Sequence, residues 1–203
     1  MSQRSHEQQR DRALDFVYGG DERASFFRDR VGGPGKRVLD LGCRSGALTA
    51  SYLAGNDVIG IDVDRRALLA ASLRGIATCW ADVEQPLPFA AADFDVVVTG
   101  ELLEHLRDPR ALLRDVRRVL RPGGTLVGSI PNGFRLKNRL RFFAGREPEG
   151  NEAHLHLFSP NAVRALLEGF TNCELHFISS RFNRLHPRLM ANIIAFSATS
   201  ATR

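Results

Sequence analysis

The sequence predicts an α/β fold, a three-layer sandwich in which helices cover both faces of a mostly parallel sheet. Two observations predict it. From residue 37 onward, short apolar runs alternate with stretches of helical periodicity, as in repeated strand–helix–strand units. The 203 residues, of which 43% are hydrophobic, are also enough for one globular domain with a buried core.

The elements follow in order along the chain. Residues 1–36 are expected to form an N-terminal helical extension, anchored by Phe16, Val17, Phe26 and Phe27, and the main domain spans 37–203. Strands are predicted at 37–41, 57–62, 76–81, 94–99 and 125–130, and helices near 46–55, 65–74 and 109–120. The last helix carries one apolar face, and the run 121–124 (RPGG) is expected to end it.

The final third of the chain adds an insert and a hairpin. Residues 132–158 form an Arg-rich insert, and Ser159 followed by Pro160 predicts the start of a helix. The apolar runs 173–180 and 191–198 have no helix-length segment between them, which predicts an antiparallel hairpin at one edge of the sheet.

Charge and cysteine usage narrow the classes of protein. The formal net charge is +5, but all except two of the 28 basic residues are arginine, a bias typical of GC-rich coding, so charge alone weighs little for nucleic-acid binding. The cysteines Cys43, Cys79 and Cys173 are widely spaced, which argues against disulfides or a zinc site. With no apolar run of about 18 residues and no signal peptide, we expect a cytoplasmic protein.

A glycine-rich loop follows the first predicted strand, in the stretch 38–49 (VLDLGCRSGALT). Ligands of open α/β sheets bind at the carboxyl ends of the strands, where this loop lies. Gly42 and Gly46 permit a positive φ and a close backbone approach, and Asp40 is able to accept hydrogen bonds from a ligand ammonium group or from the loop. Taken alone, such a loop also fits an ordinary tight turn.

Polar groups at the ends of the next strands strengthen the case for a ligand. Asp62 ends the second strand, where it would accept both hydroxyl protons of a ribose. Asp82 ends the third strand, placed for an adenine amino group, with the Val83 N–H available to a ring nitrogen. All of these strand ends lie at the same edge of the sheet, which predicts a nucleoside site there.

The chain resembles the class I S-adenosylmethionine-dependent methyltransferases, and within them the ubiquinone-pathway O-methyltransferases. The resemblance covers about residues 36–200, and its segments are VLDLGCRSGALT, VIGIDVD, ADVEQPLPF, FDVVVTGELLEHLRDP and LLRDVRRVLRPGGTLVGSIPN. It implies a Rossmann-like sheet of seven strands with the last one antiparallel, and S-adenosyl-L-methionine as cofactor. The cofactor residues that it implies are Asp40, Gly42, Cys43, Gly46, Asp62, Val63, Asp82, Val83 and Thr99.

One position of the loop departs from that family. Arg44 stands where such proteins often have glycine, and it must tolerate the loop geometry, at a cost of about 1 kcal/mol if its backbone is left-handed.

A second cluster of titratable residues follows the fourth strand. Glu101, Glu104 and His105 share one helical face, and His154 comes later in the chain. These four residues are the candidate ligands of a divalent metal, as the similarity to ubiquinone-pathway and small-RNA 2′-O-methyltransferases implies. The interpretation we favour needs no metal: they line the pocket, with His105, His154 and Glu101 as catalytic candidates. His156 is expected to be a packing or surface histidine.

The expected reaction is methyl transfer to a small-molecule acceptor, on a hydroxyl oxygen that a general base deprotonates. The arginines of 134–143 would suit an anionic acceptor. An RNA ribose methyltransferase and a catalytically silent, cofactor-binding partner protein stay open as alternatives, whereas binding to nucleic acid is not the favoured interpretation. A nicotinamide dehydrogenase is disfavoured because GxGxxG is absent. No pattern specifies an oligomeric state.

The insert itself carries an amphipathic segment. Leu136, Leu140 and Phe143 share one helical face, with arginines around the rest. Such a segment serves as a lid, rests on a membrane surface, or forms an ordinary solvated helix over the edge of the sheet, and we favour the last.

Overall fold

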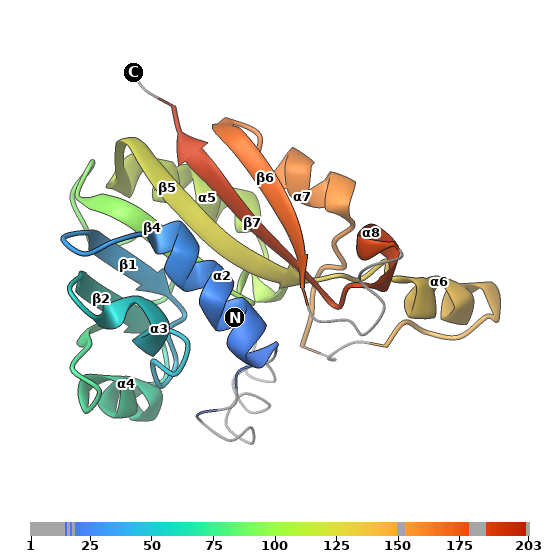
Figure 1. Ribbon diagram of the computed structural model, residues 1–203, viewed down its shortest axis with the longest axis horizontal. Helices are drawn as coiled ribbons and strands as arrows, with labels where there is room; N and C mark the ends of the chain where they lie inside the picture. Colours follow the sequence, from blue (N-terminus) through green and yellow to red (C-terminus); the bar gives the residue numbers. More distant parts are fainter. Residues whose placement is uncertain (1–14, 16, 18, 150–152, 179–185, 202–203) are drawn as a thin grey trace.

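Seven strands form one sheet in the order β3-β2-β1-β4-β5-β7-β6 (Figure 1). The computed structural model describes residues 15, 17, 19–149, 153–178 and 186–201. β1 to β5 are parallel to one another, and β7 is antiparallel to both β5 and β6. The strands are β1 Arg37–Leu41, β2 Asp57–Asp62, β3 Ala77–Trp80, β4 Phe94–Gly100, β5 Leu120–Pro131, β6 Phe170–Ile178 and β7 Ile193–Ser200. The α/β class, the seven strands and the antiparallel last strand are therefore confirmed.

Helices cover both faces of this sheet and divide the core in two. One face packs under α2, α3 and α4, and the other under α5 and α7. The helices are α2 Gly20–Val31, α3 Ala50–Leu53, α4 Arg65–Ser72, α5 Pro109–Val119, α6 Leu136–Phe143, α7 Pro160–Leu166 and α8 Pro187–Met190, with a 3₁₀ turn, η1, over Leu103–His105. The central strands β1 and β4 are buried almost throughout, as parallel strands covered on both faces should be.

Side-chain caps start three of the helices. Asp64 accepts a hydrogen bond from Arg66 N (2.9 Å) at the start of α4. Asp108 caps α5 in the same way. Ser159 accepts from Ala162 N (3.2 Å), with Pro160 in the first turn of α7, as the sequence predicts. Each cap satisfies a backbone N–H that the helix leaves without a partner.

All three helices predicted between the strands are shorter than expected, and α4 ends at Ser72 rather than near residue 74. The helix predicted at 46–55 is reduced to α3, because residues 42–49 form turns in which Gly46 has φ +77°. The helix predicted to reach residue 120 ends at Val119, and Leu120 already pairs with Phe94 of β4. The RPGG run is therefore an excursion within β5, after which pairing resumes between Val96 and Thr125.

The N-terminal segment and the insert lie outside the alternating strands and helices of the sheet. In the N-terminal segment, Phe27 and Val31 of α2 are buried against the sheet, and Phe16 lies outside the described residues. In the insert, α6 projects from the body beyond the ends of β5 and β7 (Figure 1). No helix in the described part of the chain combines the length and the apolar content needed to cross a bilayer.

Candidate functional site

The glycine-rich loop follows β1, as the sequence predicts, and is hydrogen-bonded to β2. The N–H groups of Gly42 and Cys43 both donate to the carbonyl oxygen of Ile61, at 2.8 and 3.0 Å. Gly42 has φ +70°, and a Cβ at Gly46 would lie 2.2 Å from Ile76 Cδ1, so neither position accepts a side chain freely. Arg44 adopts φ +50°, which is the left-handed geometry expected for the residue that replaces glycine there.

Asp40 ties this loop to the core. Its Oδ2 accepts hydrogen bonds from Thr49 Oγ1 (2.5 Å) and from the Tyr52 hydroxyl (2.7 Å). The carboxyl group is buried, and burial raises its pKa to about 6, although the two hydrogen bonds act in the opposite direction. Asp40 therefore holds the loop from within.

Replacing Asp40 with asparagine should flatten part of the pH dependence of stability. The folded-state pKa of Asp40 lies above its unfolded value, so its proton stabilises the fold below about pH 4 and this contribution is lost as the pH rises to about 6. The shift corresponds to about 3 kcal/mol. Urea unfolding from pH 4 to 7.5 should show wild type losing about this much stability relative to Asp40→Asn; parallel curves would contradict the assignment.

A cavity lies where the ends of the first four strands meet. It is lined by residues from all four ends: Gly42, Arg44, Asp62, Val63, Ala81, Val83, Gly100, Glu101 and Leu102. Of the predicted cofactor residues, the structure brings Gly42, Asp62, Val63 and Val83 together here. The cavity measures about 40 Å³, and Leu102 narrows it, because a Cβ on Gly42 would lie 3.2 Å from Leu102 Cδ1.

Asp62 stands at the wall of this cavity. Its Oδ2 accepts from Arg44 N (3.0 Å) and its Oδ1 from Asp64 N (2.8 Å). The side chain is largely buried, and burial raises the pKa of its carboxyl group. Two backbone N–H groups thus hold the carboxylate at the wall of the cavity.

The other predicted cofactor residues are placed differently. The sulfur of Cys43 packs against Gly60 in the core, and Cys43 is not among the residues that line the cavity. Thr99 is buried, and its hydroxyl has no hydrogen-bond partner among the described residues. Asp40 and Gly46 are not among the residues that line the cavity either; Asp40 instead holds the loop through its hydrogen bond from Thr49.

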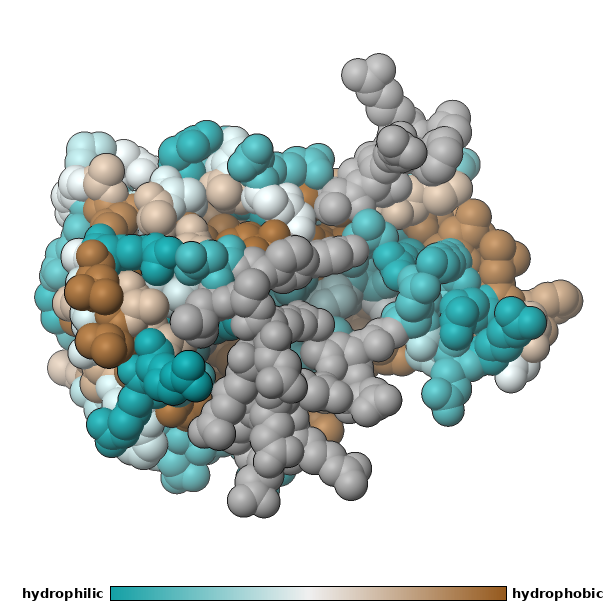
Figure 2. Space-filling view, turned by 90° about the horizontal axis from the view of Figure 1, so that it is seen from below, coloured by the Kyte–Doolittle hydropathy of each residue, from teal (hydrophilic) through white to brown (hydrophobic). Residues whose placement is uncertain are grey.

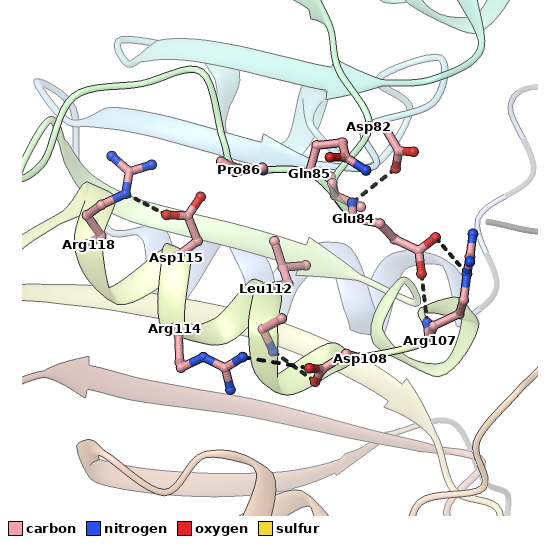
Figure 3. A pocket seen from close by; sticks show the side chains of 12 residues that line it. Asp82, Glu84, Gln85, Pro86, Arg107, Asp108, Leu112, Arg114, Asp115 and Arg118 are labelled. Carbon is pink, nitrogen blue, oxygen red and sulfur yellow. Dashed lines mark hydrogen bonds and ion pairs between the residues drawn. The ribbon is translucent and has the colours of Figure 1, made fainter.

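Asp82 lines a second cavity, of about 590 Å³, which lies between the 82–86 loop and α5 (Figure 3). Val83 lines both cavities, so they adjoin at this residue. Around the second cavity, charged side chains pair with one another, Glu84 with Arg107 at 3.4 Å and Asp115 with Arg118 at 2.5 Å. Asp82 accepts from Glu84 N at 3.0 Å, which fixes the turn that follows β3.

The sequence analysis missed Arg23, which α2 places beside the site. Its side chain is only 5% exposed, and its Nη1 lies 3.6 Å from Glu101 Oε2. A Cβ on Gly100 would lie 2.6 Å from Arg23 Nη2, so the glycine makes room for the guanidinium. Glu101 itself adopts φ +54°. The signal was present: Arg23, Phe27 and Val31 repeat at intervals of four, which puts the arginine on the apolar face of α2.

Three of the four candidate metal or catalytic residues gather beyond β4. Glu104, His105 and His154 offer ligand atoms within 4.8 Å of one another. His105 Nδ1 lies 3.1 Å from the carbonyl oxygen of Ala153 and donates to it, which leaves Nε2 facing Glu104 Oε1 at 3.9 Å. The His105 and His154 rings meet edge to face, 4.8 Å apart. Glu101 is outside this cluster, because its carboxylate pairs with Arg23.

Glu104 is the most deeply buried acid of the site. Burial raises its pKa well above the usual value, and the charge of Glu101 adds to the effect. Neither of its carboxylate oxygens has a hydrogen-bond partner among the described residues. Its backbone oxygen accepts from Leu155 N and His156 N, which holds the segment 153–158 against η1. His156 Nε2 contacts the carbonyl oxygen of Leu106 at 2.9 Å, so it packs as predicted.

Comparisons with known proteins place this site in a family. The family described as a methyltransferase domain matches residues 7–175. The ubiquinone biosynthesis O-methyltransferase of Hahella chejuensis is 37% identical over 117 residues, which are 54% of this chain and 49% of that protein. The protein of the same name from Aliivibrio fischeri is 31% identical over 147 residues, 66% of this chain and 62% of that protein. The chain thus spans about half to two thirds of these relatives' length.

Solved structures share the fold. A SAM-dependent methyltransferase from Archaeoglobus fulgidus superposes with a TM-score of 0.73 at 17% identity, covering 98% of this chain and all of that one. Phosphoethanolamine N-methyltransferase 2 of Haemonchus contortus, solved with S-adenosyl-L-methionine, gives 0.69 at 16% identity, covering 89% of this chain and 52% of that one.

Proposed function

The chain belongs to the class I S-adenosylmethionine-dependent methyltransferases, and from this we propose that it transfers a methyl group to a hydroxyl oxygen of a small molecule. One observation carries the proposal: the cavity at the strand ends and the Glu104, His105 and His154 cluster flank the same short segment, Glu101–Leu103, at the end of β4. A cavity that would hold part of the cofactor therefore lies beside a group able to take a proton. The name of the relatives favours an O-methyltransferase.

The residues at the strand ends fit the cofactor. Gly42, with its positive φ, lets the backbone approach a ligand, and Asp62 is oriented to accept from the two ribose hydroxyls. Val83 lines both cavities and Asp82 lines the larger one beside it, which suits an adenine edge. S-adenosyl-L-methionine supplies a methyl group already activated on a sulfonium, so positioning for in-line transfer is the main task of the protein.

A hydroxyl acceptor adds the need for a base. In the proposed reaction, the half-buried His154 or the buried His105 would take its proton while the acceptor oxygen bonds to the methyl carbon and the carbon–sulfur bond breaks. His105 Nε2 carries the lone pair when Nδ1 donates to Ala153 O. Glu101, held by Arg23, would position the acceptor. The Arg-rich insert favours an acceptor that is anionic.

The same cluster fits a divalent metal as a second candidate. Glu104, with no hydrogen bond to its carboxylate from the described residues, and the two histidines form a mixed oxygen and nitrogen ligand set. A bound metal would lower the pKa of an acceptor hydroxyl. Activity that survives exhaustive chelation would exclude the metal-dependent mechanism and leave the histidines as bases.

The proposed function is tested by binding and turnover together. Calorimetry should show S-adenosyl-L-methionine binding, and transfer of a labelled methyl group to a hydroxylated ubiquinone precursor should follow. Binding without transfer to any hydroxyl acceptor would instead favour a catalytically silent relative, and transfer only to RNA would favour a ribose methyltransferase.

Replacing Asp62 with alanine should weaken cofactor binding at least tenfold. The variant loses charge-assisted hydrogen bonds to the ribose, which amounts to about 1.5 kcal/mol. Asp57→Ala is the matched control, because Asp57 lies at the opposite end of β2 and pairs with Arg37 on the surface. Calorimetric titration measures both, and equal affinities for the two variants would remove Asp62 from the cofactor site.

A further inference from the structure

A groove of about 330 Å³ lies between α5 and the segment that joins α7 to β6. Arg110, Arg114 and Arg117 of α5 line it, and the buried side chains of Leu113 and Leu166 form its apolar floor. Its volume is within the range of pockets that bind small molecules. The cavity at the strand ends shares none of these lining residues, so the groove is a separate feature of the surface.

Two of the three arginines are not neutralised by the protein. Arg114 lies 3.7 Å from Asp108 (Figure 3), whereas Arg110 and Arg117 have no ion pair and no side-chain hydrogen bond among the described residues. Arg118 of the same helix, by contrast, donates to two backbone carbonyl oxygens. Like charges three or four positions apart on a helix destabilise it. A bound anion would therefore relieve the repulsion along this face of α5.

The positions of the two unpaired arginines also favour a ligand. Arg110 lies in the first turn of α5, where the partial positive charge of the helix N-terminus disfavours a cation. Arg117 lies in the last turn, where the helix dipole favours a cation, so the dipole explains Arg117 but not Arg110. A Cβ at Gly169 would lie 2.5 Å from Arg117 Nη1, so the glycine leaves room for the guanidinium at the groove.

The extent of the charge selects the kind of ligand. Arg110 and Arg117 are seven positions apart, which is about 10 Å along the helix, and Glu168 adds a negative charge to the lining. A stripe of this length is too short for the many phosphate contacts on which nucleic-acid binding depends. It does fit one phosphate group, because the planar fork of arginine binds phosphate bidentately. The apolar floor beside it suits an organic group attached to that phosphate.

We propose that this groove binds a phosphate monoester of an aromatic or alkyl group, with the phosphate against Arg110 and Arg117 and the organic group on Leu113 and Leu166. Such a phosphate carries about 1.5 to 2 negative charges at pH 7, which the two guanidinium groups would share. The Glu168 carboxylate would oppose its binding. The inference stands independently of the proposed reaction, because none of these residues lines the cavity at the strand ends or belongs to the cluster beyond β4.

The test is a ³¹P NMR titration of phenyl phosphate with the full chain at low salt, beside the same titration of inorganic phosphate. We expect phenyl phosphate to bind more tightly, because only this probe reaches the apolar floor. Arg110→Gln/Arg117→Gln should weaken its binding about tenfold or more, the loss expected for hydrogen bonds to a charged group. Glu168→Gln should instead strengthen it, because this variant removes the one acid among the lining residues.

Arg28→Gln/Arg66→Gln is the matched control and should leave the affinity for phenyl phosphate within about twofold, as expected for sites that do not touch the groove. Both arginines are exposed, and they lie on α2 and α4, which cover the opposite face of the sheet. The control removes the same charge from a surface that is also mixed in hydropathy, since Figure 2 shows hydrophilic side chains beside apolar ones at the end of the molecule that carries α4.

Four results would overturn the proposal. They are equal weakening by both double variants, no saturable binding of phenyl phosphate to wild type, equal affinity for phenyl and inorganic phosphate, and a preference for a single-stranded RNA oligonucleotide that Arg110→Gln/Arg117→Gln abolishes. Circular dichroism checks that the variants fold. Calorimetry with S-adenosyl-L-methionine should give the same result for wild type and Arg110→Gln/Arg117→Gln, so a failure of phosphate binding is distinguishable from a failure of the proposed enzyme function.

Discussion

Replacing Arg23 with methionine is expected to destabilise the fold by about 3–5 kcal/mol, the effect of removing one partner from a buried ion pair. Methionine retains much of the arginine stem but removes the cation that lies 3.6 Å from the Glu101 carboxylate, which is 18% exposed. The positive charge of Arg23 also lowers the pKa of Asp40, so the ionised form of Asp40 loses a stabilising field at pH 7. Urea unfolding at pH 7 measures the difference in free energy of unfolding.

A double variant separates charge from packing in this prediction. Arg23→Met/Glu101→Gln should recover a large part of the lost stability, because the uncompensated carboxylate is gone. Arg28→Met is the control on the same helix, since that arginine is 59% exposed and should change stability by less than about 0.5 kcal/mol. If Arg23→Met lowered the free energy of unfolding no more than the control does, the pairing of α2 with the site would make no contribution to stability.

Replacing His154 with alanine should lower methyl transfer by about 100-fold or more and leave the affinity for S-adenosyl-L-methionine within twofold. General-base catalysis contributes about 10² to 10⁴ to such rates. The His154 ring meets that of His105 at the cluster, whereas no residue that lines the cavity at the strand ends lies in the segment 153–158. Single-turnover transfer and calorimetry give the two quantities.

His156→Gln is the control for this experiment, because glutamine is able to keep a hydrogen bond to the Leu106 carbonyl oxygen. We expect less than a threefold change in rate. An equal loss in both variants would mean that the segment 153–158 acts through its packing. Loss of activity in the wild type on chelation would give His154 the role of a ligand instead.

Local signals in the sequence predicted most of the fold and part of the site. The run before Gly42 predicts β1 exactly, and Asp62 lies at the cavity because parallel strands end at one edge. The cap at Ser159 also depends only on neighbours within one turn. Such features follow from residue order, since the groups that interact are close along the chain or are brought together by strand periodicity.

Features that depend on tertiary contacts were missed. Glu101 was predicted to join Glu104 and the histidines, but Arg23, 78 positions earlier, takes its carboxylate. The helix ends next to the RPGG run as predicted, but the run lies within β5, because Leu120 before it already pairs with Phe94. The outward turn of α6 could not be read either, because it is set by Asn138 and the distant loop at Glu149 rather than by the apolar stripe.

The position of β7 has a consequence for how the molecule assembles. β6 is synthesised before β7, yet among the described strands it pairs only with β7, which itself joins β5. β6 therefore joins the sheet only after residues 193–200 have been synthesised and have paired as β7. A lesion that releases β7 would detach two strands at once and leave two unpaired edges, each a template for association between chains.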